Sequence, residues 1–240
     1  MTVTGGWLVT GGTRGIGRAV VDQVAKGGGA VAVLARTPAA EPYASDRVLE
    51  IPTDVTDTDA VAGALARARE HLGGVDVVVN CAGVHRGGRI ADLARRRWDE
   101  VLATNLTGAY EVCHAAAPNL AAGAAVVNVG AVVGFRGFPG DSAYAAAKAG
   151  LAGLTRSLAV ELAPAGVRVN LVVPGFVDTA MTAGLSTAAR RRVVAAIPAG
   201  RTGSPEEIAD VVVCVAGATY MTGAVVPVDG GLMATFGGTG

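Results

Sequence analysis

Trp7-Leu-Val-Thr10-Gly11-Gly-Thr-Arg-Gly15-Ile-Gly17 is the stretch that decides the fold. A short apolar run typical of a strand leads directly into a glycine-rich turn, and a helical pattern follows through Lys26. Such a turn needs glycine because its backbone must come close to a pyrophosphate held at the start of the helix. The alternative is a glycine turn that binds nothing, and the strand before it and the helix after it argue against that. The residues expected at the phosphates are Gly11, Thr13, Arg14, Gly15, Ile16 and Gly17.

The rest of the chain alternates strand-like and helix-like segments. Further strands are expected at 30–35, 48–51, 75–80, 125–129, 167–173 and 224–228, and helices at about 57–71, 95–118 and 142–163 and from 205. This alternation predicts parallel pairing, right-handed crossovers and a ligand at the carboxyl ends of the strands. We therefore predict an α/β fold with one domain over 1–240. It is a Rossmann-type doubly wound parallel sheet of about seven strands, with helices on both faces and a polar substrate lid at about 176–203.

Composition excludes several classes of function. The chain has 20 basic and 20 acidic residues and no long run of one charge, so neither nucleic acid nor an anionic membrane is expected as a partner. Its 3 cysteines are scattered in apolar surroundings, which favours reduced thiols and a cytoplasmic protein. No Cys/His cluster points to a metal, and no apolar segment is long enough to span a bilayer.

Arg36 bears on the choice of dinucleotide. It ends the second expected strand, where a nucleotide-binding fold often places an acid that accepts a hydrogen bond from the ribose 2′-hydroxyl. No acid lies between Ala30 and Ala40, and an arginine suits a 2′-phosphate. Arg14 in the glycine turn could approach the same phosphate, so NADP(H) is favoured over NAD(H). The alternative is that Arg36 is a solvated loop residue.

Tyr144 and Lys148 lie four residues apart in the expected helix over 142–163, which places them on one face. A cation beside a phenol favours the phenolate, so we expect Lys148 to lower the pKa of Tyr144 toward the range of a proton donor. For an isolated pair of this spacing, an ordinary surface helix is the better interpretation. A catalytic interpretation of Tyr144 and Lys148 therefore depends on the nucleotide-binding pattern that precedes them in the chain.

The motifs taken in order resemble the short-chain dehydrogenase/reductase family over essentially the whole length. Within that family the chain looks most like 3-oxoacyl-acyl-carrier-protein reductases and related bacterial ketoreductases. The ordered set at family spacing is specific, whereas the glycine motif alone would be weak. The motifs are the glycine turn, Asp54-Val55, Asn80-Cys-Ala-Gly83, Asn105, Tyr144 with Lys148, Pro174-Gly175 and Asp229-Gly230-Gly231.

The resemblance implies a role for each motif. Tyr144 would protonate a carbonyl oxygen as hydride arrives from the nicotinamide, and Lys148 would bind the nicotinamide ribose. Asn105, inside an apolar helical segment, would hold a water that relays protons to Lys148. The remaining residues would bind the coenzyme: Asp54 and Val55 at the adenine, Asn80 and Gly83 at the adjoining ribose, and Thr179 at the carboxamide beyond Pro174 and Gly175, with Ala82 and Val177 also in contact with the coenzyme. Family members are commonly homotetramers.

One position departs from the family pattern. The family places a serine just beyond the fifth strand, where it donates a hydrogen bond to the substrate oxygen, and the matching residue here is Ala131. Losing one such donor typically costs on the order of 10²- to 10³-fold in rate. Ser142 is the nearest hydroxyl in sequence, but on the helix it would point away from Tyr144. Three explanations remain: a deliberate replacement, a natural reductase that works with Tyr144 alone, or a homologue that only binds.

The sequence thus predicts an NADPH-dependent ketoreductase for a 3-oxoacyl or polyketide-like carbonyl, impaired at Ala131. The alternative is a non-catalytic NADP(H)-binding homologue that serves as a binding or assembly subunit. The substrate would be a small molecule or an acyl thioester, which an acyl carrier protein could present. His85 and Arg86 follow the fourth strand and could meet a phosphopantetheine arm or an acidic carrier, or could be exposed loop residues.

Overall fold

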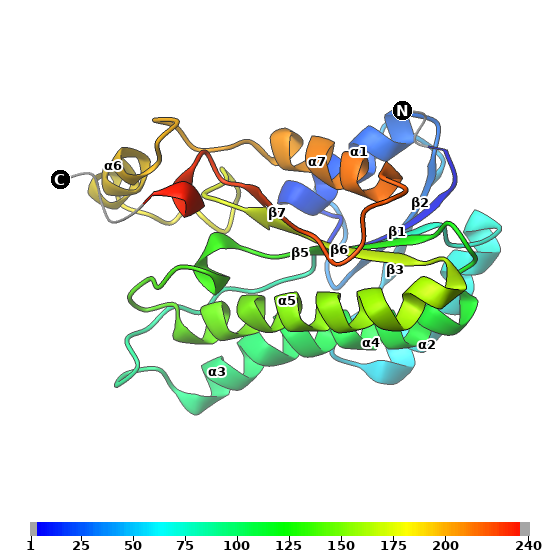
Figure 1. Cartoon of the computed structure of the whole chain (residues 1–240), viewed down its shortest axis with the longest axis horizontal. Helices are drawn as coiled ribbons and strands as arrows, with labels where there is room; N and C mark the ends of the chain where they lie inside the picture. Colours follow the sequence, from blue (N-terminus) through cyan, green and yellow to red (C-terminus); the bar gives the residue numbers. More distant parts are fainter. Residues whose placement is uncertain (1–3, 236–240) are drawn as a thin grey trace.

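A seven-stranded parallel sheet with the strand order β3-β2-β1-β4-β5-β6-β7 forms the centre of the computed structural model, which describes residues 4–235 (Figure 1). The strands are β1 (Gly6–Thr10), β2 (Ala30–Ala35), β3 (Val48–Pro52), β4 (Val77–Asn80), β5 (Ala125–Val129), β6 (Arg168–Pro174) and β7 (Val225–Val228). The expected α/β fold with a doubly wound parallel sheet is confirmed. Strand order reverses between β1 and β4, which places a ligand crevice at their carboxyl ends.

Helices cover both faces of the sheet. The α-helices of the described residues are α1 (Gly15–Lys26), α2 (Thr58–Leu72), α3 (Arg95–Leu102), α4 (Gly108–Ala116), α5 (Ser142–Leu162), α7 (Pro205–Gly217) and α6 (Thr187–Ala196), of which α6 covers neither face. In β1, Trp7 and Val9 belong to the apolar cluster beneath α1 and α7, whereas Leu8 belongs to the cluster formed with α2 and α4. Figure 1 shows these two helical layers above and below the sheet. Burial on both faces explains why the strands are continuous apolar runs.

The single helix expected over 95–118 is interrupted, which corrects that prediction. A π-helical turn, Ala103–Thr107, separates α3 from α4 and contains Asn105. The Asn105 side-chain amide donates a hydrogen bond of 2.8 Å to the carbonyl of Val101, four residues earlier. A side chain that takes the carbonyl of the preceding turn competes with the regular helical ladder, and an inserted π turn is one outcome.

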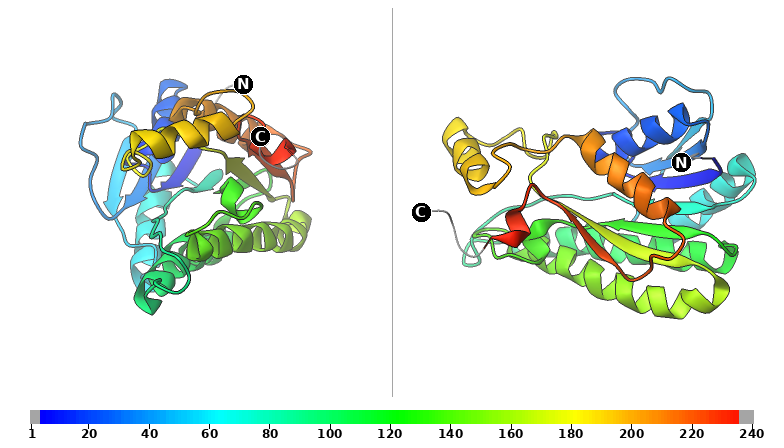
Figure 2. Two further views of the ribbon diagram at one scale, coloured as in Figure 1. Left: turned by 90° about the vertical axis from the view of Figure 1, so that its left-hand side faces the viewer. Right: turned by 45° about the horizontal axis from the view of Figure 1, so that its top comes forward.

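The segment expected to act as a lid leaves the body of the protein and returns to it. Val177 and Gly203 form a parallel bridge, and Asp178 donates its backbone N–H to the Gly203 carbonyl at 3.0 Å. Between them α6 buries none of its residues and stands off the end of the sheet (Figure 2). In the described part of the chain, no helix is both long and apolar enough to cross a membrane.

The N-cap of α7 is expected to contribute to the stability of the fold. Ser204 and Glu207 form a capping box at the start of this helix, which packs through buried residues against the sheet. We expect Ser204→Ala to lower the free energy of unfolding by about 1 kcal/mol, measured by urea titration. The side chain of Ser186 caps the exposed α6 by accepting from the N–H of Ala189, so Ser186→Ala is the control and should change global stability much less. Equal losses in both variants would contradict this.

Candidate active site

The glycine turn forms a cradle that has no room for side chains. Gly11 has a φ of +68°, and a Cβ there would lie 2.8 Å from Cα of Ala82. A Cβ on Gly17 would lie 2.4 Å from the carbonyl oxygen of Gly11. Gly15 has a φ of +55°, and its Cβ would face the Thr179 side chain at 3.3 Å. The expected phosphate residues and Thr179, which is far away in sequence, therefore meet at one place.

The start of α1 suits an anion. Arg14 occupies the N-cap position without a capping hydrogen bond from its side chain, and no acid lies in the first turn. Backbone N–H groups at a helix start carry partial positive charge, and here no carboxylate competes for them. Together with the cradle, this geometry fits the pyrophosphate of a dinucleotide.

Tyr43 is a residue of this region that the sequence patterns did not reveal. Its hydroxyl donates a 3.0 Å hydrogen bond to the carbonyl of Gly12, and the guanidinium of Arg18 lies 4.2 Å from its ring centroid. Burial, followed by the nearby Glu50, raises the pKa of Tyr43 to about 12. This phenol therefore stays protonated and holds the loop before β3 against the glycine turn.

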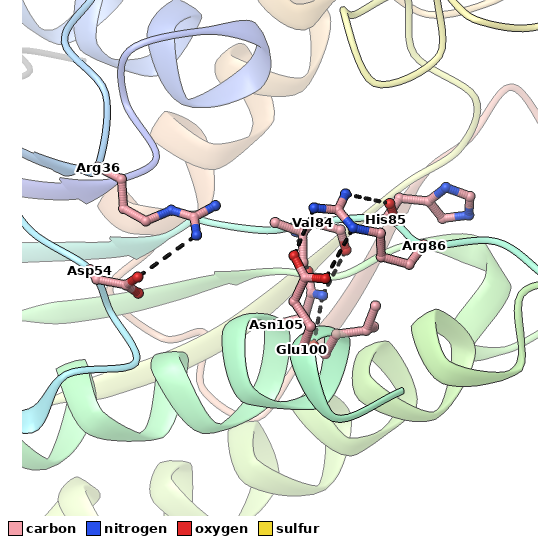
Figure 3. Close-up of polar contacts among 8 residues, drawn as sticks. Arg36, Asp54, Val84, His85, Arg86, Glu100 and Asn105 are labelled. Atoms are coloured by element: carbon pink, nitrogen blue, oxygen red, sulfur yellow. Dashed lines mark hydrogen bonds and ion pairs between the residues drawn. The ribbon is translucent and has the colours of Figure 1, made fainter. Parts of the chain in front are cut away.

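Arg36 and Asp54 lie beside each other at the ends of β2 and β3 (Figure 3). Arg36 Nη1 is 3.7 Å from Asp54 Oδ2, and both side chains are well exposed. Burial is the largest single influence on Asp54 and acts upward. Hydrogen bonds from Thr56 and the charge of Arg36 nevertheless hold the pKa of Asp54 below its ordinary value. The neighbouring Val55 is buried against Gly108, so only Asp54 of the expected adenine pair presents its side chain to solvent.

The turn after β4 is bonded to β1. Thr10 Oγ1 accepts hydrogen bonds of 3.0 Å from the backbone N–H groups of Cys81 and Ala82. Asn80, expected at a ribose, instead turns its side chain inward, where Nδ2 donates to Asn128 Oδ1 at 2.9 Å. A ribose contact at Asn80 would therefore have to come from its backbone. Gly83 faces Asn105, since a Cβ there would lie 2.6 Å from Oδ1.

Asn105 anchors the next residue of this turn (Figure 3). Its Oδ1 accepts from the N–H of Val84 at 3.1 Å, and its Nδ2 donates to the Val84 carbonyl at 2.8 Å. With the bond to Val101, both amide hydrogens are used. Among the described residues, the side-chain amide of Asn105 is thus bonded only to backbone groups of Val84 and Val101. A water bound by this residue would have to contact its backbone instead.

Tyr144 and Lys148 lie together near the start of α5, with Nζ of Lys148 5.7 Å from the tyrosine ring centroid. The expected lowering of the Tyr144 pKa is wrong for this structure, because burial, with smaller effects of Cys81 and Asp141, raises it above the ordinary value. Lys148 Nζ donates to the carbonyl of Val129 at 2.7 Å, and burial lowers the pKa of Lys148 to about 8. Desolvation is therefore the largest influence on the pKa of both groups.

A histidine lies against the other side of this pair. The rings of His85 and Tyr144 meet edge to face, with centroids 5.3 Å apart and an interplanar angle of 85°. Nε2 of His85 is 2.7 Å from Oδ1 of Asp141, and these side chains are 35% and 15% exposed. The sequence patterns left His85 as a contact for a phosphopantetheine arm or an acidic carrier, or as an exposed loop residue, and did not single out Asp141. No local signal could have paired residues that are 56 positions apart.

Ala131 lies in the turn after β5, where its carbonyl accepts from the N–H of Gly134 at 3.0 Å. The nearest hydroxyl in sequence does not replace the missing one. Oγ of Ser142 is buried and has no hydrogen-bond partner within the described residues, so it is not presented to a ligand.

The segment after β6 is held against the end of β7. Gly175 donates its N–H to the Val228 carbonyl at 2.9 Å, and a Cβ there would lie 2.6 Å from Cα of Asp229. Val177 is buried in the core beneath α1, so its side chain does not enter the crevice. Thr179 reaches the glycine turn. Pro174 ends β6 at this edge of the sheet.

Known proteins share this architecture. A family model described as Enoyl-(Acyl carrier protein) reductase matches residues 11–233. The chain is 40% identical over 229 residues to the 3-oxoacyl-acyl-carrier-protein reductase MabA of Mycobacterium avium, covering 94% of this chain and 88% of that protein. It is 37% identical over 233 residues to the corresponding reductase FabG of Vibrio harveyi, covering 94% and 96%. A solved short-chain dehydrogenase/reductase from Serratia marcescens matches with a TM-score of 0.87 at 34% identity, covering 97% of this chain and 100% of that one.

The chain is a short-chain dehydrogenase/reductase. Within this family it resembles the 3-oxoacyl-acyl-carrier-protein reductases, and it is an oxidoreductase that acts on the CH–OH/C=O pair. Its cofactor is a nicotinamide dinucleotide. The glycine cradle and the first turn of α1, which contains no acid, fit the pyrophosphate of that cofactor.

The buried ammonium of Lys148 predicts a pH effect on stability. Its pKa is about 8 in the folded protein, below the value of 10.5 for a free lysine, so between pH 7 and 9 the folded state releases this proton first. The unfolded state then binds more protons, and the free energy of unfolding rises with pH by about 1 kcal/mol from this group. We expect wild type to gain that amount relative to Lys148→Met between pH 7 and 9, measured by urea unfolding without added coenzyme.

Lys26 is an exposed lysine at the end of α1 and supplies the matched control. The difference in unfolding free energy between wild type and Lys26→Met should not change over the same pH range. If the difference in unfolding free energy between wild type and Lys148→Met also stays constant from pH 7 to 9, the ammonium of Lys148 is not desolvated.

Proposed function

We propose that this protein is an NADPH-dependent ketoreductase that reduces a 3-oxoacyl or polyketide-like carbonyl. The observation that carries the proposal is the joint position of Tyr144 and Lys148, in a fold whose curated relatives MabA and FabG are 3-oxoacyl-acyl-carrier-protein reductases. A nicotinamide coenzyme, when bound, supplies hydride for the carbonyl carbon. The protein must then deliver a proton to the carbonyl oxygen.

Tyr144 is the proton donor in this proposal. Burial raises the pKa of Tyr144, so the phenol stays protonated at neutral pH but is a weaker acid, and transfer of its proton depends on stabilisation of the phenolate. The ammonium of Lys148 lies 5.7 Å from the centroid of the Tyr144 ring. Its positive charge favours the phenolate that remains after Tyr144 has given its proton to the substrate. Both side chains project from one rigid helix, which keeps their geometry fixed.

Asn105 acts through position. Its side-chain amide is fully engaged with Val84 and Val101, so a water that relays protons toward Lys148 would be held by its backbone carbonyl. A π turn supports this role because its carbonyls leave the regular ladder of helical hydrogen bonds.

Arg36 and Arg14 support NADPH as the coenzyme. Arg36 is half exposed at the end of β2, and its contact with Asp54, at 3.7 Å, is loose enough to leave the guanidinium available to a 2′-phosphate. Arg14 is exposed in the glycine turn. The substrate would be a small carbonyl compound or an acyl thioester carried by an acyl carrier protein, with α6 as the lid. A homotetramer is the expected assembly, as in the family.

Arg36→Ala tests the coenzyme. Removing a charged hydrogen-bond donor to phosphate should weaken NADPH binding on the order of 10- to 100-fold and leave NADH binding unchanged. Fluorescence titration with each coenzyme measures both constants. Arg47, whose Nη1 donates to the Gly28 carbonyl, provides the control, because Arg47→Ala should affect neither coenzyme. Equal loss for NADPH and NADH would contradict the assignment.

Tyr144→Phe tests the chemistry. Without its proton donor, the protein should oxidise NADPH with a 3-oxoacyl thioester on the order of 10²- to 10⁴-fold more slowly, while NADPH binding persists. Tyr110→Phe is the matched control, since Tyr110 is exposed on α4 and stacks on His114. Tight NADPH binding without thioester turnover by the wild type would instead support a binding or assembly subunit.

A further inference from the structure

The loop after β4 and the turn before α5 are bonded to each other across the candidate active site. The N–H of Gly88 donates to the carbonyl of Gly140 at 2.9 Å, and His85 Nε2 meets Asp141 Oδ1 at 2.7 Å. The first loop follows the coenzyme turn and the second leads into the helix of Tyr144. The His85 ring is thereby placed against the side chain proposed to donate the proton.

Hydrogen bonds hold the chain on both sides of His85. The residue before it, Val84, is held by the amide of Asn105 through two hydrogen bonds. The carbonyl of His85 accepts from Arg86 Nη1 at 3.0 Å, and Arg86 forms two further bonds to the carboxylate of Glu100 (Figure 3). An exposed loop histidine without a role needs no such support. A catalytic group does, because its geometry has to be set before the reaction.

The chemistry of the pair suits a hydrogen-bond donor. A carboxylate at one ring nitrogen fixes the orientation of the imidazole and keeps a proton on that nitrogen. An imidazole that carries both of its protons donates from its second nitrogen as well. Such a donor is missing at position 131, because the methyl group of Ala131 cannot donate a hydrogen bond to a substrate oxygen.

We propose that His85, oriented by Asp141, is the second hydrogen-bond donor to the substrate carbonyl oxygen, in place of the hydroxyl that Ala131 does not provide. This inference rests on the proposed ketoreductase function. Tyr144 still transfers the proton, and His85 stabilises the negative charge that builds on the oxygen while hydride reaches the carbon. Asp141 is then a positioning residue, since it acts through His85.

A double-mutant cycle tests the proposal. His85→Phe keeps an aromatic ring against Tyr144 and removes both nitrogens, so packing is retained and donation is lost. We expect it to lower kcat with a 3-oxoacyl thioester on the order of 10²- to 10³-fold, with NADPH affinity unchanged. In a chain that also carries Ala131→Ser, the same change should cost less than about tenfold, because the hydroxyl takes over the contact.

Two further variants separate donation from structure. His85→Asn keeps a donor near the position of Nδ1 and should recover part of the lost kcat. His71→Phe changes an exposed histidine in the last turn of α2 and should leave kcat unchanged. Thermal unfolding and NADPH binding, measured on every variant, exclude loss of the fold.

The outcomes distinguish this inference from the function on which it rests. Equal loss from His85→Phe with and without Ala131→Ser, or no loss at all, overturns the role of His85 and leaves the ketoreductase intact. Activity in Ala131→Ser but none in the wild type also overturns it, because His85 would then fail to replace the hydroxyl. No turnover by either protein, despite NADPH binding, overturns the proposed ketoreductase and the inference together.

Discussion

The side-chain amide of Asn105 makes three hydrogen bonds to backbone groups, at 2.8 to 3.1 Å, and these join the middle of one helix to the loop after β4. Its hydrogen bond to the carbonyl of Val101 lies at the π turn between α3 and α4. Its two hydrogen bonds to Val84 fix the start of the loop that carries His85. Its Oδ1 also lies so close to Gly83 that a side chain there would collide with it. The arrangement of the active site therefore depends on one buried amide whose bonds are all internal.

Burial controls the charges of the proposed reaction. It lowers the pKa of Lys148 to about 8 and raises that of Tyr144, so each group is biased toward its neutral form. It also raises the pKa of the nearby Cys81 to about 11, which keeps that thiol protonated and unreactive. A protonated phenol is ready to donate a proton.

The departure at Ala131 and the pair of His85 with Asp141 belong together. Both flank the helix of Tyr144, one in the turn after β5 and the other between the β4 loop and the start of α5. The family fold supplies a place for a donor beside the tyrosine, and a different residue on a different loop can fill it. This division is physically reasonable because the carboxyl ends of neighbouring strands β4 and β5 bring their loops to the same edge of the sheet.

Local sequence patterns were sufficient for the fold class, the alternation of strands and helices, the glycine cradle and the joint position of Tyr144 and Lys148. Each of these follows from apolar periodicity or from spacing along one element, which residues close in sequence determine. Only the tertiary structure decided that Asn80 turns inward, that Asn105 bonds to a loop 21 residues away and that His85 meets Asp141. It also reversed the expected direction of the Tyr144 pKa, because desolvation depends on what the whole chain packs around a group, and spacing along a helix does not report it.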